Sequence, residues 1–459
     1  MPKTEVLAIL AGKLFNSQKR CILEDQVIMI DQELGVILGV LNLGVFKRLH
    51  GKDDGIDFMD LGHLTIIPGL VDVHVHLFLH AYAETPWNDQ VTKESLAERT
   101  IRATVHARRT LMAGFTTVRD LGTEGALDAD ISLRKCLSGR EPMISGPRYY
   151  CANRAIVTTG AYGPRSSLYP SSRGVEGVMG AEPVDGVDGC IREVRKQVGV
   201  GADWVKIYAD YRVRAAMQDV SPSLSSKSIP TFNRQELEVM ITTAHDLGVK
   251  VAAHANSWAA VEDLLDLGVD TIEHGAEIYN DQDQNISLIK KLAASKGKTT
   301  WVPTLAAYHT LGKSRWEAVK QTFVKAVIEE GVENIACGGD TGVFSHGENA
   351  LELILMRQLG VPWEKVISWA TLGGWECVRG FEWEGSRGRQ RIRDLEANPR
   401  RVSDVDRGIP FGTIRKGWAA DIVGIDGDLT GSPEEFEKSL TMGVKLVIKN
   451  GNIVKRVGK

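Results

Sequence analysis

The segment PGLVDVHVHLF, residues 68–78, ends an apolar run with two histidines, His74 and His76, which are separated by a single valine. Successive side chains of a β-strand point to opposite faces, so residues two apart share one face. Both imidazoles are therefore expected to point the same way from the end of a buried strand. The question is what surrounds such a strand.

A short β-rich run, a break and a helix-forming stretch recur between about residue 66 and residue 340. Eight runs fit strands: TIIPGLVDV (65–73), FTTVRD (115–120), RYYCANRA (148–155), DWVKIYA (203–209), KVAAHA (250–255), DTIEHG (270–275), TTWVPT (299–304) and NIACGGD (334–340). Asn233 and Glu236 open one intervening stretch with the spacing of a helix cap. Eight alternating units predict an α/β fold with a closed (β/α)₈ barrel, with an open doubly wound sheet as the competing architecture.

Both ends of the chain carry short alternating strands and no long helical pattern. They predict a small composite β-sandwich domain built from residues 1–67 plus 412–459, next to a barrel domain of residues 68–411. Within the barrel domain, residues 382–408 are highly charged and lack aliphatic periodicity, so we expect an exposed insertion without a catalytic role. The long polar run 211–232 is a candidate lid.

The composition of the 459-residue chain, with 43% hydrophobic and 25% charged residues and a net charge of −4, is typical of a soluble globular protein. Lysine and arginine are scattered, which argues against a nucleic-acid or membrane partner and favours a small-molecule substrate. The six cysteines form no C-x-x-C pair, and no 18-residue apolar segment occurs. We therefore expect reduced thiols and a cytoplasmic location.

Polar residues stand at or near the ends of five predicted strands, where barrel enzymes carry their working groups. They are His74, His76, Lys206, His254, His274 and Asp340. A lone histidine there is usually only hydrogen-bonded, and Lys206 alone could be salt-bridged. Four of the eleven histidines at strand ends favour a common role. Neutral imidazoles with a carboxylate suit zinc, which would supply a hydroxide whose proton Asp340 could accept.

The motifs H-x-H after PGLVD, GADWVKIY, VAAHA, IEHG and GGDTG resemble those of the amidohydrolase superfamily, over nearly the whole chain. The sequence is most similar to the branch of imidazolonepropionase-like hydrolases, prolidase-like Xaa-Pro and Xaa-Arg dipeptidases and ochratoxinase. The resemblance implies two divalent metal ions, expected to be Zn²⁺. By the same resemblance His74 and His76 bind one ion, His254 and His274 the other, carbamylated Lys206 bridges them, and Asp340 contacts the first and acts as acid and base. It also implies a homo-oligomer.

The sequence departs from that branch after the third strand, where many peptidase-like members carry a histidine in Gly-Gly-His-Gly. Here TTGAYGP, residues 158–164, places Tyr162 as a candidate hydrogen-bond donor to the substrate carbonyl, unless the role is absent. Tyr208, Tyr211 and Arg212 are candidates for binding a substrate carboxylate, or are surface residues. Tyr308 and His309 could line the same cavity, or belong to an aromatic core.

The leading hypothesis is a binuclear metal-dependent amidohydrolase that cleaves an amide C–N bond in an N-acyl amino acid, dipeptide or cyclic amide with a metal-bound hydroxide. A mononuclear deaminase would not need Lys206. A lactonase or other ester hydrolase would use the same attack and stays open. A non-enzymatic scaffold is expected to have lost ligands, whereas all six positions are occupied by ligand-type residues.

Overall fold

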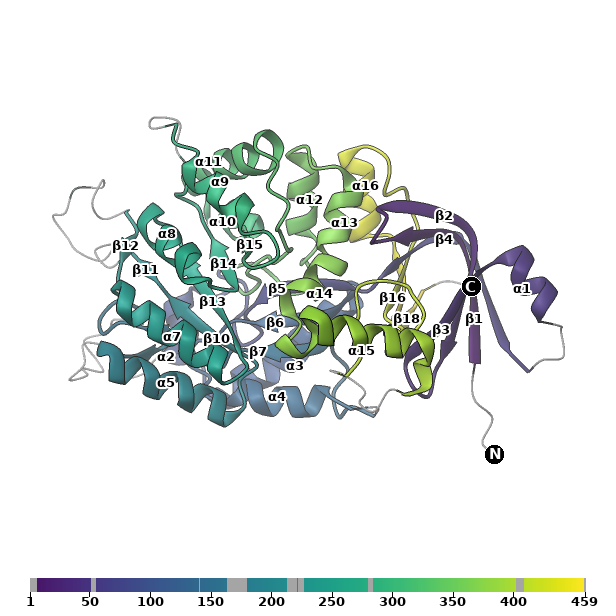
Figure 1. Ribbon diagram of the computed structural model, residues 1–459, viewed down its shortest axis with the longest axis horizontal. Helices are drawn as coiled ribbons and strands as arrows, with labels where there is room; N and C mark the ends of the chain where they lie inside the picture. Colours follow the sequence, from purple (N-terminus) through teal and green to yellow (C-terminus); the bar gives the residue numbers. More distant parts are fainter. Residues whose placement is uncertain are drawn as a thin grey trace.

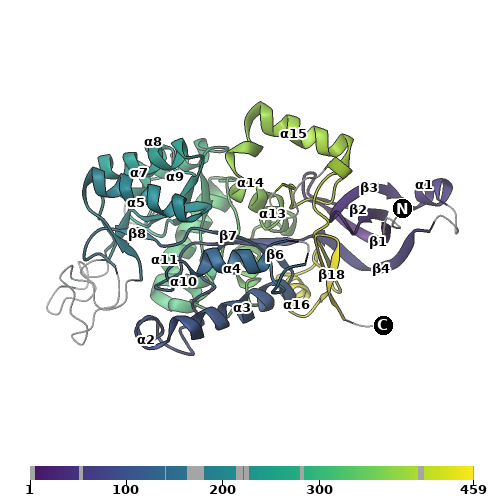
Figure 2. The same ribbon diagram turned by 90° about the horizontal axis from the view of Figure 1, so that it is seen from below.

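The computed structural model describes most of the chain, and Figures 1 and 2 show it in two orientations. The described residues are 6–50, 55–139, 141–162, 180–212, 221, 227–279, 284–401 and 408–457. Most of the candidate lid of residues 211–232 lies outside these ranges. Within the described residues, no helix has both the length and the apolar character required to cross a bilayer.

Strands from both ends of the chain form one seven-stranded sheet beside the barrel (Figure 1). In chain order the strands are β1 (Val6–Asn16), β2 (Cys21–Asp31), β3 (Val36–Asn42), β4 (Asp57–Pro68), β16 (Ile422–Ile425), β17 (Val444–Lys449) and β18 (Asn452–Arg456). They lie in the order β18-β17-β16-β4-β1-β2-β3. Strand β4 joins the two ends because it pairs in parallel with β1 and antiparallel with β16. Helices α1 (Leu43–Leu49) and α16 (Pro433–Thr441) accompany this sheet.

Parallel strands form the barrel that the sequence predicts. They are β5 (Leu70–Val75), β6 (Phe115–Asp120), β7 (Arg148–Cys151), β10 (Trp204–Tyr208), β13 (Lys250–Ala255), β14 (Thr271–His274) and β15 (Thr300–Val302). The ladders run β5-β6-β7 and β10-β13-β14-β15, and the Asp203 amide donates to the Cys151 carbonyl to join them. Two short strands extend the second ladder beyond β10: β8 (Ile156–Val157) pairs in parallel with β10, and β9 (Glu182–Pro183) pairs with β8. The short strands β11 (Asp210–Tyr211) and β12 (Ile229–Pro230) form a separate antiparallel pair.

The barrel is closed by residues 334–341, which form only isolated bridges, although the sequence predicts a regular eighth strand there. Trp301 bridges Ile335 on one side, and Val75 bridges Thr341 on the other. The amide of Asp340 donates to the carbonyl of His74 at 2.8 Å. Gly338 explains the irregularity: a Cβ there would lie 2.7 Å from the Cβ of His74, so this segment approaches β5 more closely than an ordinary strand can.

Helices surround the barrel and the loops at its ends (Figures 1 and 2). They are α2 (Trp87–Lys93), α3 (Leu96–Met112), α4 (Ala129–Leu137), α5 (Gly186–Val200), α7 (Arg234–Asp246), α8 (Trp258–Leu267), α9 (Ser287–Ala294), α10 (Leu305–Leu311), α11 (Lys313–Phe323), the π-helical turn η1 (Val324–Glu329), α12 (Leu351–Gln358), α13 (Trp363–Trp369) and α14 (Leu372–Val378). The predicted cap of α7 is confirmed, because Asn233 and Glu236 exchange side chain to backbone hydrogen bonds.

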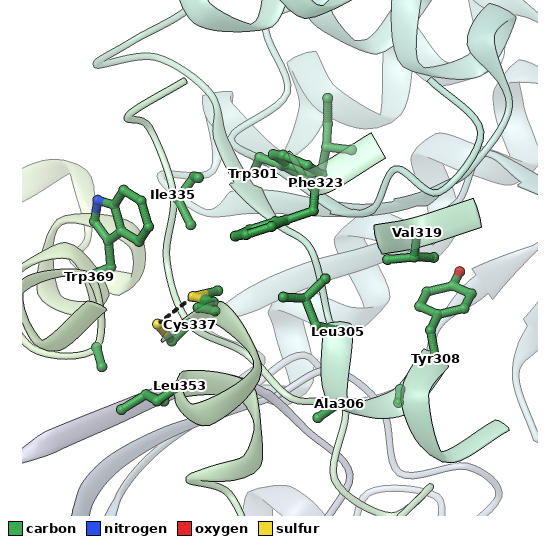
Figure 3. Packing of buried hydrophobic residues seen from close by; sticks show 14 of the residues in the cluster. Trp301, Leu305, Ala306, Tyr308, Val319, Phe323, Ile335, Cys337, Leu353 and Trp369 are labelled. Atoms are coloured by element: carbon green, nitrogen blue, oxygen red, sulfur yellow. Dashed lines mark hydrogen bonds between the residues drawn. The ribbon is translucent and has the colours of Figure 1, made fainter. Parts of the chain in front are cut away.

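Trp301 of β15 is buried in the hydrophobic core of the barrel, next to Phe323 (Figure 3). Its ring packs against Phe323, with centroids 6.1 Å apart, and its Nε1 donates to the carbonyl of His274 at 2.9 Å. A Cβ on Gly275 would lie 2.8 Å from that Nε1, and Gly275 has a φ of +67°. A glycine is therefore required after His274, both by its backbone conformation and by this contact.

The described part of the charged segment 382–408 is largely exposed, as expected for an insertion, but it is helical. Residues Gly385–Ala397 form helix α15, between the short 3₁₀ turns η2 (Phe381–Trp383) and η3 (Pro399–Arg401). Trp383 and Leu395 are buried in a cluster with Trp375, and the Arg391 guanidinium lies 3.9 Å from the Trp383 ring centroid. Two buried anchors hold the helix where aliphatic periodicity gave no signal, while residues 402–407 lie outside the described residues.

Candidate metal centre

Three predicted ligands lie together at the ends of β5 and the closing segment. Suitable ligand atoms of His74, His76 and Asp340 all lie within 4.8 Å of one another. Asp340 Oδ1 is 3.2 Å from His76 Nε2 and 3.6 Å from His74 Nε2. Both histidines are buried, as expected for two residues on the inward face of one strand. Asp340 has a φ of +61°, a left-handed conformation that is costly for a non-glycine residue and aims its carboxylate at the histidines.

Two further histidines face this group from neighbouring strands. The ring centroids of His254 and His274 are 4.5 Å apart, and those of His74 and His274 are 5.3 Å apart. The Nδ1 of His274 forms a hydrogen bond with Thr304 Oγ1 at 2.7 Å, which leaves its Nε2 available. Asn256 Nδ2 lies 3.3 Å from His254 Nε2. The four histidines therefore gather at one end of the barrel.

Lys206 of β10 is buried beside them, and its Nζ has no hydrogen-bond partner within the described part of the chain. It lies 5.5 Å from the ring centroid of Tyr208. Burial lowers the pKa of Lys206 to about 8, although the carboxylates of Glu273 and Asp340 act in the opposite direction. An ammonium group in such a place is costly without a partner, so the residue fits a site that is completed by a ligand.

The protonation states of His74, His254, His274 and Asp340 suit metal binding, whereas His76 has to lose its proton first. Burial and the nearby Lys206 lower the pKa of His74 to about 4 and that of His254 to about 3, and burial holds the pKa of His274 well below its usual range. Burial also acts to lower the pKa of His76, but the hydrogen bond to Asp340 raises it to about 9. Burial would raise the pKa of Asp340, yet His74 and His76 hold it well below its usual range. Neutral imidazoles and an ionised carboxylate are the donors that zinc prefers.

A cavity of about 290 Å³ opens directly above these residues. The ring of Tyr208 stacks on His254 with centroids 4.7 Å apart, and the Tyr308 hydroxyl donates to Asn256 at 2.9 Å. The remaining polar or aromatic lining residues are Tyr82, Glu124, Tyr162, Tyr211, Arg212, Ser228 and Arg315. The cavity thus joins a nitrogen-rich, carboxylate-bearing floor to walls of tyrosine and arginine.

A family model described as the amidohydrolase family matches residues 65–380. The chain belongs to this family. It is therefore a hydrolase that acts on carbon–nitrogen bonds. An uncharacterised protein of Mycobacterium tuberculosis (strain ATCC 25618 / H37Rv) is 24% identical to it over 335 residues, which cover 70% of this chain and 75% of the relative.

Among solved structures, the amidohydrolase is similar to a Xaa-Pro dipeptidase with methionine bound in its active site. That similarity has a TM-score of 0.74 at 27% sequence identity and covers 98% of this chain and 100% of the dipeptidase. The ochratoxinase of A. niger shares the fold, with a TM-score of 0.71 at 21% identity over 99% of this chain and 96% of that chain.

Buried charges behind the candidate ligands of the amidohydrolase were not foreseen from the sequence. Glu273 Oε2 lies 2.8 Å from His74 Nδ1, and Arg119 Nη2 donates to Glu273 Oε1 at 2.8 Å. Arg119 keeps the pKa of Glu273 at about 2 against the opposing effect of burial, so this carboxylate accepts from Nδ1 and leaves His74 Nε2 free to bind a metal. The Gly122 carbonyl fixes His76 in the same way, at 2.9 Å from Nδ1. A charged residue inside each of the apolar runs FTTVRD and DTIEHG was the available signal, because buried charges need partners.

The other predicted site residues differ in whether they line the cavity and in where their side chains point. Tyr162 lines the cavity, but its hydroxyl donates to Glu124 Oε2, so its proton is directed away from a substrate carbonyl. Tyr208, Tyr211, Arg212 and Tyr308 also line the cavity. His309 does not: it is exposed and packs against Trp316, with ring centroids 5.2 Å apart, because the helical rotation after Tyr308 turns it away.

Proposed function

We propose that this amidohydrolase is a binuclear, zinc-dependent hydrolase that cleaves the amide bond of an N-acyl amino acid, a dipeptide or a related cyclic amide. The convergence of four histidines, Asp340 and an unpartnered lysine at one end of the barrel supports this assignment. In the proposal, His74 and His76 hold one ion, His254 and His274 hold the other, and Asp340 contacts the first.

Lys206 is the proposed bridge between the two ions. With a pKa near 8, a substantial fraction of its amine is neutral near neutral pH, and a neutral amine can add carbon dioxide. A nitrogen–carbon bond forms, the nitrogen releases one proton, and the neutral amine becomes a carbamate whose single negative charge is shared by two oxygens. The resulting group satisfies the buried position that a lone ammonium cannot, and it supplies the two oxygen donors that a bridged site needs.

The bound ions would lower the pKa of the attacking water and polarise the scissile carbonyl. In the proposal Asp340 would take the proton of that water and deliver it to the leaving nitrogen, because its ionised carboxylate lines the cavity beside His74 and His76. We assign Arg212, with the hydroxyls of Tyr208 and Tyr211, to the carboxylate of the leaving amino acid, since these side chains line the wall next to His254. Tyr308 would support this wall through its hydrogen bond to Asn256.

Metal content per chain tests the proposal most directly. Elemental mass spectrometry on protein purified without chelator should find about two equivalents of zinc or a similar ion, falling to one or fewer in Lys206→Ala. Lys250→Ala is the matched control, because Lys250 is also a buried lysine, on the neighbouring strand, but pairs with Glu384 outside the candidate site. It should retain both ions.

One equivalent that is insensitive to Lys206→Ala would contradict the bridged site and favour a mononuclear deaminase. A parallel assay of N-acyl amino acids, dipeptides and matched esters or lactones then separates amide hydrolysis from the ester chemistry that the same attack permits. The proposal requires turnover of at least one amide class. Hydrolysis of esters alone would overturn it.

We also propose that the enzyme is cytoplasmic and forms a homo-oligomer. The six cysteines are all free, which fits a reducing cytoplasm. Helix α3 exposes Leu96, Ile101 and Val105, apolar side chains that a homo-oligomer would cover. Light scattering coupled to size-exclusion chromatography should therefore give a mass above that of one 50.3 kDa chain.

A further inference from the structure

One acidic side chain of the cavity, Glu124, has no part in the proposed metal centre. It lies on the loop after β6, is only 1% exposed and has a φ of +51°, a strained conformation for glutamate. Strain of this kind persists where the surrounding structure holds a side chain in a particular place. Here that place is the wall of the cavity, next to His76.

The donors around Glu124 are neutral. Tyr162 and Trp87 donate to Oε2, the latter at 3.0 Å, and the Tyr208 hydroxyl reaches Oε1 only at 3.5 Å. No ion pair to Glu124 occurs among the described residues. The nearby buried Arg99 donates to the carbonyls of Phe78 and Thr123 instead. Arg99, His76 and Lys206 interact with the Glu124 carboxylate electrostatically, but none of them forms an ion pair with it within the described residues. A buried carboxylate with only neutral hydrogen-bond donors can still take a cation in direct contact.

Oε1 of Glu124 has only the long contact with Tyr208, and it lies near the ring of His76. A Cβ on Gly122 would lie 3.6 Å from Glu124 Oε1 and also 3.6 Å from His76 Cε1, so the carboxylate oxygen and the imidazole border the same small space. Gly122 keeps that space open. A ligand group that reaches Oε1 therefore lies close to the atoms on which the amide would be cleaved.

The opposite charge lies along the same cavity. Arg212 follows Tyr211, whose ring centroid is 5.8 Å from that of His254, and Arg315 of α11 lines the cavity as well. Among the described residues, the carboxylate that pairs with Arg212 is that of Glu277, at 3.8 Å. The cavity thus presents a carboxylate next to His76 and guanidinium groups on the side of His254. A ligand with a cation at one end and an anion at the other matches this arrangement.

We propose that Glu124 forms a cation-binding subsite that accepts a protonated amine on the acyl part of the substrate. This inference rests on the proposed amide hydrolysis and narrows its substrates: compounds with a free amine beside the scissile carbonyl bind in preference to N-acyl amino acids that lack one. Tyr162 and Trp87 position the carboxylate, and Arg212 binds the other end of the substrate.

The test compares substrates that differ only in that amine. L-Alanyl-L-amino acids and their desamino analogues, the N-propionyl-L-amino acids, are assayed with proline, phenylalanine, leucine and arginine as leaving residues. The wild-type enzyme should have a kcat/KM at least tenfold higher for the amine-bearing partner. In Glu124→Gln this ratio should fall by about 10- to 100-fold, the range of a charge-assisted hydrogen bond in a desolvated site.

Glutamine is the informative replacement because its carbonyl oxygen can still accept from Tyr162 and Trp87 while the charge is removed. Glu277→Gln is the matched control, since it neutralises a carboxylate on the Arg212 side, and it should leave the ratio unchanged. A wild-type ratio near one would overturn the subsite. An equal loss for both substrate classes in Glu124→Gln would also overturn it, because it would show a purely structural role.

Failure of the subsite and failure of the proposed function give different results. If neither class and no cyclic amide is hydrolysed, the proposed function fails, and calorimetric binding of the same two compounds decides the subsite. Selective weakening of the amine-bearing compound in Glu124→Gln would support it. Equal affinities for the two compounds in the wild-type protein would refute it.

Discussion

His74 and His274 face each other across the candidate metal centre but are held in different ways. His74 lies in strand β5, and its Nδ1 bonds to an ionised carboxylate, Glu273, which is itself bound by Arg119. His274 has a φ of +76°, and its Nδ1 bonds to the neutral hydroxyl of Thr304. One ligand is thus oriented by a buried ion pair, and the other by a strained backbone with a single neutral hydrogen bond.

The contrast indicates that the two proposed metal positions differ in preorganisation. Buried charge pairs fix orientation strongly, and removing one partner leaves an uncompensated charge. A neutral hydrogen bond contributes only about 1 kcal/mol net, so a ligand held by one can reorient more easily. We therefore expect the ion held by His74 and His76 to bind more tightly than the ion held by His254 and His274.

The largest effect is expected from replacing Asp340. In the proposal this residue both contacts the more tightly bound ion and transfers the proton. Asp340→Asn keeps the size of the side chain but removes its charge and basicity, so kcat should fall by about 10³-fold or more. Steady-state kinetics measure the fall, and metal analysis shows how much of it reflects ion loss. Activity within tenfold of wild type would exclude Asp340 as acid and base.

Glu273→Gln should have an intermediate effect. It preserves the shape of the side chain but leaves Arg119 without its ionic partner and weakens the orientation of His74. Loss of such an outer partner typically lowers metal affinity by about 10- to 100-fold. Competition with a fluorescent chelator measures it, and the loss should fall on the tighter of two binding steps. A loss confined to the weaker step would reverse the comparison.

Thr304→Val should have the smallest effect. The substitution is nearly isosteric and removes only a neutral hydrogen bond to His274, so affinity should fall by about fivefold, corresponding to about 1 kcal/mol. The same competition assay should show this loss in the weaker binding step. An effect as large as that of Glu273→Gln would mean that the hydroxyl, not the backbone conformation, determines the orientation of His274.

Sequence reasoning succeeded where a residue is specified by its own strand. The ranges 115–120 and 250–255 are the observed bounds of β6 and β13, and the H-x-H spacing placed two imidazoles on the inward face of β5. The ligand roles and the division of the chain at residues 67 and 412 stay predictions. The side-chain pattern alone predicts the bounds of these strands and the direction of their side chains, because strand periodicity is a local property.

Sequence reasoning failed where position depends on distant contacts. The pairing of Arg119 with Glu273 joins residues 154 positions apart. The partners of Glu124 come from helix α2, the turn at Tyr162 and strand β10, so no local pattern reveals them. The irregular segment 334–341 follows from its close approach to His74, a tertiary constraint. Helix α15 was missed because only a few anchors bury it.

Strand β4, which leads into the strand that carries His74, pairs with β16, a strand that is synthesised much later. Strand β4 runs through Gly69 into β5, the strand of His74, yet one of its two neighbours is β16, which the ribosome makes more than 350 residues later. Pairings this distant in sequence form late and slow folding. Until β16 emerges, β4 exposes an unpaired edge that can recruit other chains. Nascent amidohydrolase should therefore depend on chaperones until its last strands are made.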